Sequence, residues 1–241
     1  MECMLSDFAM RMVFGLALAT AVGGRGFPNS LLRTIGLVLL GFSALAVTAS
    51  RTEAGRGWVA GTGLAAALGS YAGVAAWTLG RGRAGRLATA TVAASSAAGL
   101  AAISAAGPAP MMDAVGRGSS GFLIGAALAA MLLGHRYLTE PTTAIGPLRR
   151  AIAVMGLALA VRAGLACWGL GAGWVPAGWL FATVRWGLGL AGPAVATPLA
   201  WKAAGIRSTQ SATGILFVAL GFVLAGELAS MAASRGAPAI V

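Results

Sequence analysis

Continuous apolar blocks are the feature that most limits what this chain can fold into. They are about 17–25 residues long, the length that a helix needs to cross a hydrocarbon core of about 30 Å. Of the 241 residues, 58% are hydrophobic and 10% are charged, whereas a soluble domain has about 25% charged residues. Barrel strands alternate apolar and polar residues, and these blocks do not. The sequence therefore predicts an all-α fold, a polytopic transmembrane helical bundle.

The blocks predict about eight membrane-spanning helices in a single integral membrane domain that covers residues 1–241. The segments between them are rich in residues that interrupt helices, as in GGRGFPNS, GRGRAGR and GPAPMMDAVGRG. The shortest connection, between the sixth and seventh spans, is GAG. The predicted spans are residues about 8–24, 31–50, 57–79, 87–106, 119–137, 148–170, 174–198 and 212–233.

The basic residues lie mainly between the apolar blocks and predict an orientation. A net charge of +11 would suggest nucleic-acid binding in a soluble chain. Here we expect membrane lipids as partners and no nucleic acid, because basic connections face anionic headgroups. The larger set of basic residues marks the cytoplasmic side, so both termini are predicted outside. That set is Arg25, Arg33, Arg81, Arg83, Arg86, Arg136, Arg149, Arg150, Lys202 and Arg207, against Arg11, Arg51, Arg56, Arg117 and Arg235.

Three ionisable residues fall inside predicted spans: Arg162, Arg185 and Glu227. At 1.5 Å per residue, each lies about 20–23 Å from the cytoplasmic end of its helix, so the three share one layer. They belong to consecutive spans, which tend to be neighbours. One interpretation is a structural ion pair. Another is a site for an anion or a proton-coupled carboxylate, and a third is an error in a span boundary.

A second polar cluster is predicted at the cytoplasmic face: His135, Tyr137, Arg207, Thr209 and Gln210. His135 is the only histidine, whereas membrane cytochromes commonly hold haem with imidazole ligands and zinc sites need about four ligands. We therefore predict no cofactor and no metal site, with haem through His135 as a remote alternative. Ser208 or Thr209 caps the last helix in the simpler interpretation; an anion bound beside Arg207 is the other.

Glycines spaced four residues apart predict close contacts between helices. Small residues let the backbones of two helices approach, which matters in lipid because apolar side chains gain little by association there. A compact bundle is the simpler interpretation, and mobile helices around a path are the alternative. The pairs are Gly69 and Gly73, Gly121 and Gly125, and Gly169 and Gly173.

Two segments of the second half resemble a family of uncharacterised bacterial polytopic membrane proteins. They are MLLGHRYLTEPT and VRWGLGLAGPAVATPLAWKAAGIRSTQSATGILFVALGFVLAGEL, and the resemblance covers residues 121–232. It implies the bacterial cytoplasmic membrane but no activity. Arg136 stands where that family has a tryptophan after the histidine. The residues within its recognisable segments are His135, Tyr137, Arg185, Arg207, Gln210, Thr213 and Glu227.

Three functions are compatible with these features. The first is a non-catalytic membrane subunit or scaffold of a larger assembly, with other membrane protein subunits as partners; no catalytic residue set is evident, so we expect no enzyme. The second is a small transporter or channel for an anion or proton-coupled solute that uses Arg162, Arg185 and Glu227. The third is a redox, lipid-binding or quinone-binding protein that works at the cytoplasmic face through the polar cluster there.

Overall fold

The computed structural model describes residues 2–50, 57–107, 109–140, 144–173 and 178–233. These residues form helices and no strand, which confirms the all-α class. Seven of the helices are long and apolar enough to cross a membrane. They are α1 (Glu2–Gly23), α2 (Asn29–Ser50), α3 (Gly57–Thr78), α4 (Gly82–Ser104), α5 (Pro110–Thr139), α6 (Gly146–Gly171) and α9 (Thr209–Ala233).

The seventh predicted span is helical but irregular. It consists of α7 (Trp179–Thr183), a π-helical segment η1 (Val184–Ala191) and α8 (Gly192–Gly205), which follow one another without a break. Pro193 is the second residue of α8, just after the π-helical segment. A proline has no N–H to donate, and its ring displaces the carbonyl four residues earlier, which favours a widened turn before it. The predicted start, residues 174–177, lies outside the described residues.

Most of the helices begin earlier than predicted, and the difference is largest at α1 and α5. α1 starts at Glu2 instead of residue 8, and α5 starts at Pro110 instead of residue 119. The sequence suggested connections there because the added turns contain charged residues. Within the bundle, those charges have partners: Arg11 and Arg117 both bind Asp7. The helices can therefore extend through segments that look too polar for a membrane.

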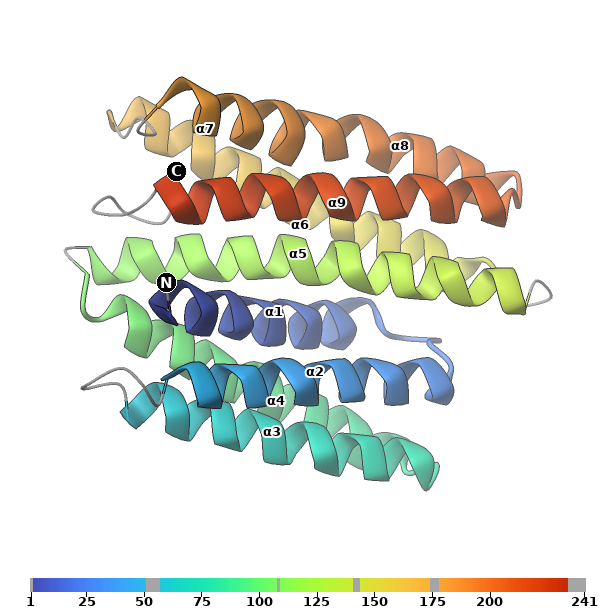
Figure 1. Ribbon diagram of the computed structural model, residues 1–241. Coiled ribbons are helices and arrows are strands. Elements are labelled where there is room, and N and C mark those ends of the chain that lie inside the picture. Colours follow the sequence, from blue (N-terminus) through green and yellow to red (C-terminus); the bar gives the residue numbers. More distant parts are fainter. Residues whose placement is uncertain (1, 51–56, 108, 141–143, 174–177, 234–241) are drawn as a thin grey trace.

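The helices form two groups of four joined through α1 and α5. In the first group, α1, α2, α3 and α4 pack in a ring, with α4 returning to α1; in the second, α5, α6, α8 and α9 do the same. Figure 1 shows α1 and α5 side by side between the two groups, and both run in the same direction. The bundle is thus a parallel arrangement of two similar halves.

Glycines bring α1 and α5 together. A Cβ atom at Gly125 would lie 2.0 Å from the carbonyl carbon of Gly15, and one at Gly121 would lie 2.6 Å from the carbonyl oxygen of Arg11. Because real Cβ atoms do not approach so closely, this contact requires glycine. The predicted close contact is therefore confirmed for Gly121 and Gly125. By contrast, nothing lies within 4 Å of a Cβ at Gly173, which has φ +84° beyond the end of α6.

Short motifs recur at matching places in the two halves. Asp7, Arg11 and Gly15 of α1 have the same spacing as Asp113, Arg117 and Gly121 of α5, and these helices are the parallel pair at the centre. The third helical segment of each half also begins with similar residues. GWVAGT is the start of α3, and GWLFAT consists of Gly178 followed by the residues of α7. In both, the threonine donates to the tryptophan carbonyl at 2.9 Å. The two halves therefore repeat in sequence as well as in helix order.

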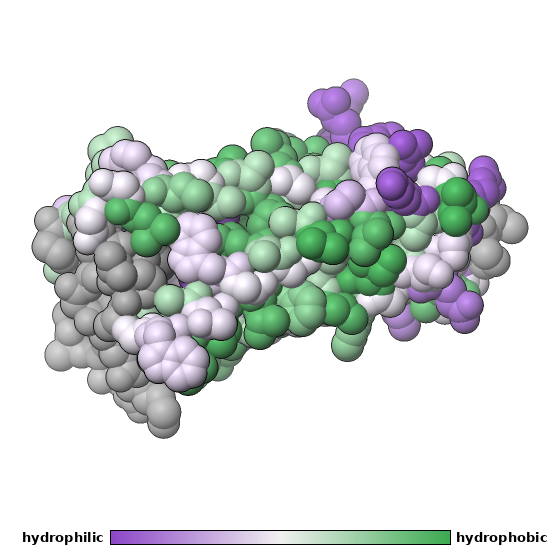
Figure 2. All heavy atoms as spheres, turned by 90° about the horizontal axis from the view of Figure 1, so that it is seen from above, coloured by the Kyte–Doolittle hydropathy of each residue, from purple (hydrophilic) through white to green (hydrophobic). Residues whose placement is uncertain are grey.

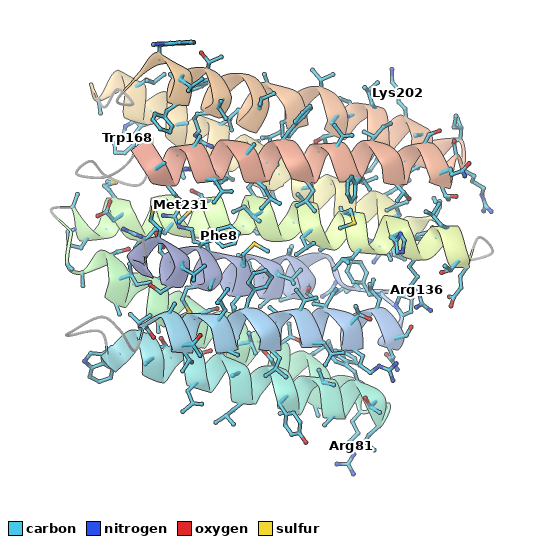
Figure 3. The ribbon with its side chains drawn as sticks, in the orientation of Figure 1. Phe8, Arg81, Arg136, Trp168, Lys202 and Met231 are labelled. Carbon is cyan, nitrogen blue, oxygen red and sulfur yellow. The ribbon has the colours of Figure 1, made fainter. Side chains whose placement is uncertain are left out.

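Among the described residues, the polar surface is concentrated at one end of the bundle. Figure 2 shows hydrophilic residues gathered there, next to a broad hydrophobic zone, and Figure 3 places Arg81, Arg136 and Lys202 at that end. The ten basic residues of the larger set lie at or near the helix ends that meet there. Of the smaller set, Arg51, Arg56 and Arg235 lie outside the described residues. Arg11 lies within α1, inside the predicted first span, whereas Arg117 lies within α5 and not in a connection, which corrects the expectation.

Candidate functional site

The three ionisable residues predicted inside the spans meet in the second half of the bundle. Arg162 projects from α6, Arg185 from the π-helical segment and Glu227 from α9. Their exposed fractions are 0%, 1% and 0%. The sequence predicted that the three residues share one depth. The structure also brings their side chains together in one site away from the surface. We call these three residues the buried triad.

Glu227 is the acceptor at the centre of the buried triad. Arg162 donates from Nε to Oε1 at 3.1 Å and from Nη2 to Oε2 at 3.0 Å. Arg185 donates from Nη1 to Oε1 of the same carboxylate. Arg162 Nη2 also contacts the Ser230 hydroxyl at 3.3 Å. The carboxylate thus holds two guanidinium groups together, in the charge-assisted geometry that makes such hydrogen bonds strong.

Close backbone packing places Arg185 within reach of Glu227. A Cβ atom at Gly226 would lie 2.1 Å from the Cα atom of Gly189, so α9 and the π-helical segment touch backbone to backbone. Glu227 follows Gly226 directly, and Arg185 lies one turn before Gly189. π-Helical turns are rare and occur often at functional sites. Local helix geometry and small residues together produce the contact between the two charges.

Arg185 is only partly satisfied. Among the described residues, its Nε and Nη2 atoms are buried without a hydrogen-bond partner. Two guanidinium groups face one carboxylate, which leaves one positive charge in excess within the buried triad. Burying a charge costs several kcal/mol unless it is paired and hydrogen-bonded. The buried triad therefore combines a net positive charge with two donor atoms of Arg185 that have no partner among the described residues.

A serine lies between the buried triad and a second charge cluster. The Ser120 hydroxyl of α5 accepts a hydrogen bond from Nη1 of Arg11 at 3.1 Å, and it also lies near the Glu227 carboxylate. The polar side chains consequently extend from the second half of the bundle to α1 in the first.

The second charge cluster joins α1 to α5 around Asp7. Arg11 binds this carboxylate through Nε at 3.1 Å and Nη2 at 2.9 Å, and Arg117 donates to the same group. The side chains of Asp7 and Arg117 are 9% and 19% exposed, so this cluster is closer to the surface than the buried triad. Sequence reasoning missed it because it left Asp7 and Arg117 outside the predicted spans, although Arg11 lay inside the first one. The repeated Asp-x-x-x-Arg-x-x-x-Gly motif was the available signal.

The residues of the polar cluster predicted near His135 lie at one end of the bundle and differ in exposure. His135, Arg207 and Gln210 are exposed, and Thr209 is half-buried. Tyr137 is 2% exposed, and its hydroxyl donates to the carbonyl of Ala144. The Tyr137 side chain is therefore packed inside the bundle and binds the connection after α5. The helix ends at Thr139, while Pro141 lies outside the described residues.

Two other polar side chains at this end, those of Arg136 and Ser208, interact with residues close to them in the chain. Arg136 donates from Nη2 to both carboxylate oxygens of Glu140, at 2.7 and 2.8 Å. Ser208, a predicted helix cap, has its hydroxyl 2.9 Å from that of Ser211. Among the described residues, no group of three or more His, Cys, Asp or Glu side chains is placed to hold a metal ion.

Arg207 has a left-handed backbone, with φ +58°. Its N–H donates to the Ala204 carbonyl, and the next N–H donates to the Ala203 carbonyl. This is the Schellman arrangement that ends many helices, and glycine is the usual residue at its left-handed position. The end of α3 has the same pair of hydrogen bonds around Gly80, with φ +68°. Arg207 therefore occupies a glycine position at some conformational cost.

The chain matches no protein-family model, and searches of curated proteins and solved structures found no match. The candidate site therefore stands on its own geometry: a buried triad with excess positive charge, with Ser120 between it and a second charge cluster.

Proposed function

We propose that this protein is a small membrane transporter or channel for an anion, or for a solute carried together with a proton, and that the buried triad is its site. The observation that carries this proposal is the state of Arg185, a fully buried guanidinium with two donors that no described residue accepts. A scaffold has no need of such a group, because apolar residues of similar volume often stabilise a buried position as well or better.

The geometry suggests how a proton and an anion are coupled. In the ion-paired state, Glu227 occupies the place of an anion between the two guanidinium groups. A proton delivered to this carboxylate removes its charge and leaves Arg162 and Arg185 available to a small anion. Loss of the proton restores the ion pairs and expels the anion. Intramembrane ionisable residues serve as relays of this kind in transporters and pumps.

The repeat architecture supports the same function. Transporters are commonly built from repeated halves, including parallel repeats related by an axis along the membrane normal. The two halves here also differ where the site lies. Gly80 and Arg207 are equivalent, because each is the left-handed residue shortly before the last helix of its half. Glu227 of α9 lies as many residues after Arg207 as Leu100 of α4 lies after Gly80. Leu100 is a buried apolar residue. The carboxylate at the centre of the triad is thus an addition of the second half.

Transport assays with purified protein in liposomes test the proposal. We expect uptake of at least one probe among chloride, phosphate, sulfate and succinate, with a rate that depends on an imposed pH gradient. Arg185→Gln should abolish uptake, and Glu227→Gln should remove its pH-gradient dependence. Glu140→Gln, which alters an exposed carboxylate at the basic end, is the matched control. No flux with any probe, or flux unchanged in both triad variants, refutes the assignment.

We place the basic end of the bundle in the cytoplasm of a bacterial cell and both chain termini outside, because basic connections are retained on the cytoplasmic side. A variant without Cys3 and Cys167 provides the background for labelling with a membrane-impermeant maleimide. In intact cells, Met111→Cys at the opposite end should be labelled, while Arg83→Cys should be labelled only after the cells are broken. The reverse pattern contradicts this orientation.

A membrane subunit or scaffold is the second candidate. The observation that favours it is an open apolar groove of about 450 Å³ on the outer face of α8 and α9, since contiguous apolar surface can receive a partner helix. Val195, Leu199, Val218 and Phe222 line it. Native mass spectrometry after purification in mild detergent tests this role. A stoichiometric partner chain that is lost with Val218→Asn supports it, and a bare monomer contradicts it.

A further inference from the structure

A large polar cavity lies in the first half of the bundle, at the basic end. Its volume is about 700 Å³, and it is bounded by the adjoining ends of α1, α2, α3 and α4. Pockets that bind small molecules commonly have volumes of about 300–1,000 Å³. Arg25, Asn29, Trp77, Arg86 and Thr89 are among its lining residues. It is separate from the buried triad, which belongs to the second half.

The lining of the cavity is positively charged. Arg25 and Arg86 both line it, and none of the described lining residues is an aspartate or glutamate. Two helices also begin at its wall, α2 at Asn29 and α4 at Gly82. Neither has an acidic residue in its first turn, and no side chain caps the start of α4. Helix N-termini attract anions through their unpaired N–H groups, so they add to the charge of the arginines.

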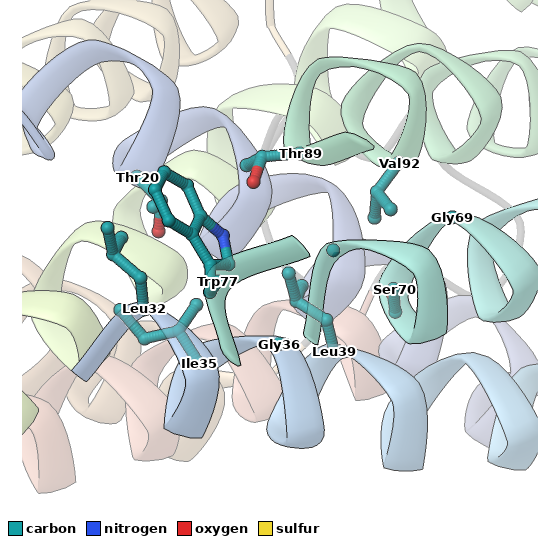
Figure 4. Close-up of a pocket in the computed structure, with 11 residues that line it drawn as sticks. Thr20, Leu32, Ile35, Gly36, Leu39, Gly69, Ser70, Trp77, Thr89 and Val92 are labelled. Atoms are coloured by element: carbon teal, nitrogen blue, oxygen red, sulfur yellow. The ribbon is translucent and has the colours of Figure 1, made fainter. Parts of the chain in front are cut away.

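The inner wall of the cavity is apolar. Trp77, 7% exposed, lies there beside Leu32, and a Cβ atom at Gly85 would lie 2.4–2.7 Å from its indole ring. Figure 4 shows Trp77 at the narrow space beyond, with Ile35, Leu39 and Val92. That space, about 10 Å³, holds at most about one water molecule. The cavity therefore has a charged mouth and a closed apolar floor.

We propose that this cavity binds a phosphate-bearing anion, either the headgroup of an anionic membrane lipid or free phosphate. Arginine side chains and helix N-termini are the groups that recognise phosphate oxygens. The apolar floor beside Trp77 suits the glycerol and first methylene groups of a lipid. This site is independent of the proposed transport function, because it uses no residue of the buried triad.

Native mass spectrometry of the full-length protein tests the site, with added phosphatidylglycerol, phosphatidylcholine or inorganic phosphate. We expect one phosphatidylglycerol to be retained in preference to phosphatidylcholine. The double variant Arg25→Gln, Arg86→Gln should reduce this retention at least about tenfold, because a charge-assisted hydrogen bond is lost with each arginine. The matched control is Arg81→Gln, Arg83→Gln, which removes exposed charges of the same end that do not line the cavity.

Ala90→Trp distinguishes binding in the cavity from attraction of the lipid to surface charge. Ala90 lines the cavity and is exposed, so an indole there should fill the space, leave both arginines in place and still abolish retention. Displacement of phosphatidylglycerol by millimolar inorganic phosphate identifies free phosphate as the occupant, and resistance to it identifies the headgroup. Equal retention of the two lipids, equal loss in the control variant, or full retention in a folded Ala90→Trp variant overturns the proposal.

Discussion

Removal of the Glu227 charge is the most informative perturbation of this protein. Glu227→Gln preserves the shape of the side chain but replaces a carboxylate with a neutral amide. Arg162 and Arg185 then face each other without the acceptor that both bind. The amide oxygen can still accept a hydrogen bond, but the N–H donors of the amide NH₂ group face the N–H donors of the arginines. The variant therefore leaves two buried positive charges without a counter-charge.

The structure indicates a large loss of stability. Breaking a buried ion pair by removing one partner costs about 3–5 kcal/mol, and here the removed partner serves two arginines that are 0–1% exposed. For a chain of this size, each kcal/mol shifts the unfolding midpoint by about 2–4 °C. Glu227→Gln should consequently lower that midpoint by about 6–20 °C.

Thermal unfolding in mild detergent, followed by intrinsic tryptophan fluorescence, measures this shift. Glu140→Gln is the control, because its carboxylate is 51% exposed and pairs with Arg136 within one helix, an arrangement worth about 0.3–0.5 kcal/mol. The triple variant Arg162→Met, Arg185→Met, Glu227→Leu removes all three charges and should restore most of the stability. A Glu227→Gln midpoint as high as that of Glu140→Gln refutes the reasoning.

Three further changes test the rest of the architecture by the same midpoint measurement. Asp7→Asn should cost about 1–3 kcal/mol, less than the triad variant because Arg117 can reach water; an equal or larger loss contradicts this ranking. Gly125→Ala should disrupt the contact with Gly15, whereas Gly164→Ala, with open space around its Cβ, should be nearly neutral; equal midpoints would show that the α1–α5 contact does not require glycine. Arg207→Gly should stabilise by about 1 kcal/mol because it relieves a left-handed backbone, and a lower midpoint argues that this side chain contributes a contact.

The sequence predicted the helical class and the layer of charge, because both depend on composition and spacing. Continuous apolar segments identify helices that can cross a membrane wherever they pack. Arg162, Arg185 and Glu227 stood out because a charge inside such a segment is costly. The same logic failed at Asp7 and Arg117, which it left outside the predicted spans. Near a helix end, a charged turn in a loop and a paired charge in a helix look alike in sequence.

Contacts between distant segments decided what these charges do. Ser120 accepts a hydrogen bond from Arg11 and lies near Glu227 of the other half, and no local sequence pattern predicts this arrangement. Likewise, the cavity at Arg25 and Arg86 exists because the ends of four helices meet. The sequence by itself determined which segments must leave water, since that depends on the hydrophobicity of each residue. The pairing of buried charges and the placement of cavities depend on which helices become neighbours. Close backbone contacts, such as Gly15 with Gly125 and Gly189 with Gly226, fix these neighbours. Such contacts join residues far apart in the chain, so they are visible only in the packed bundle.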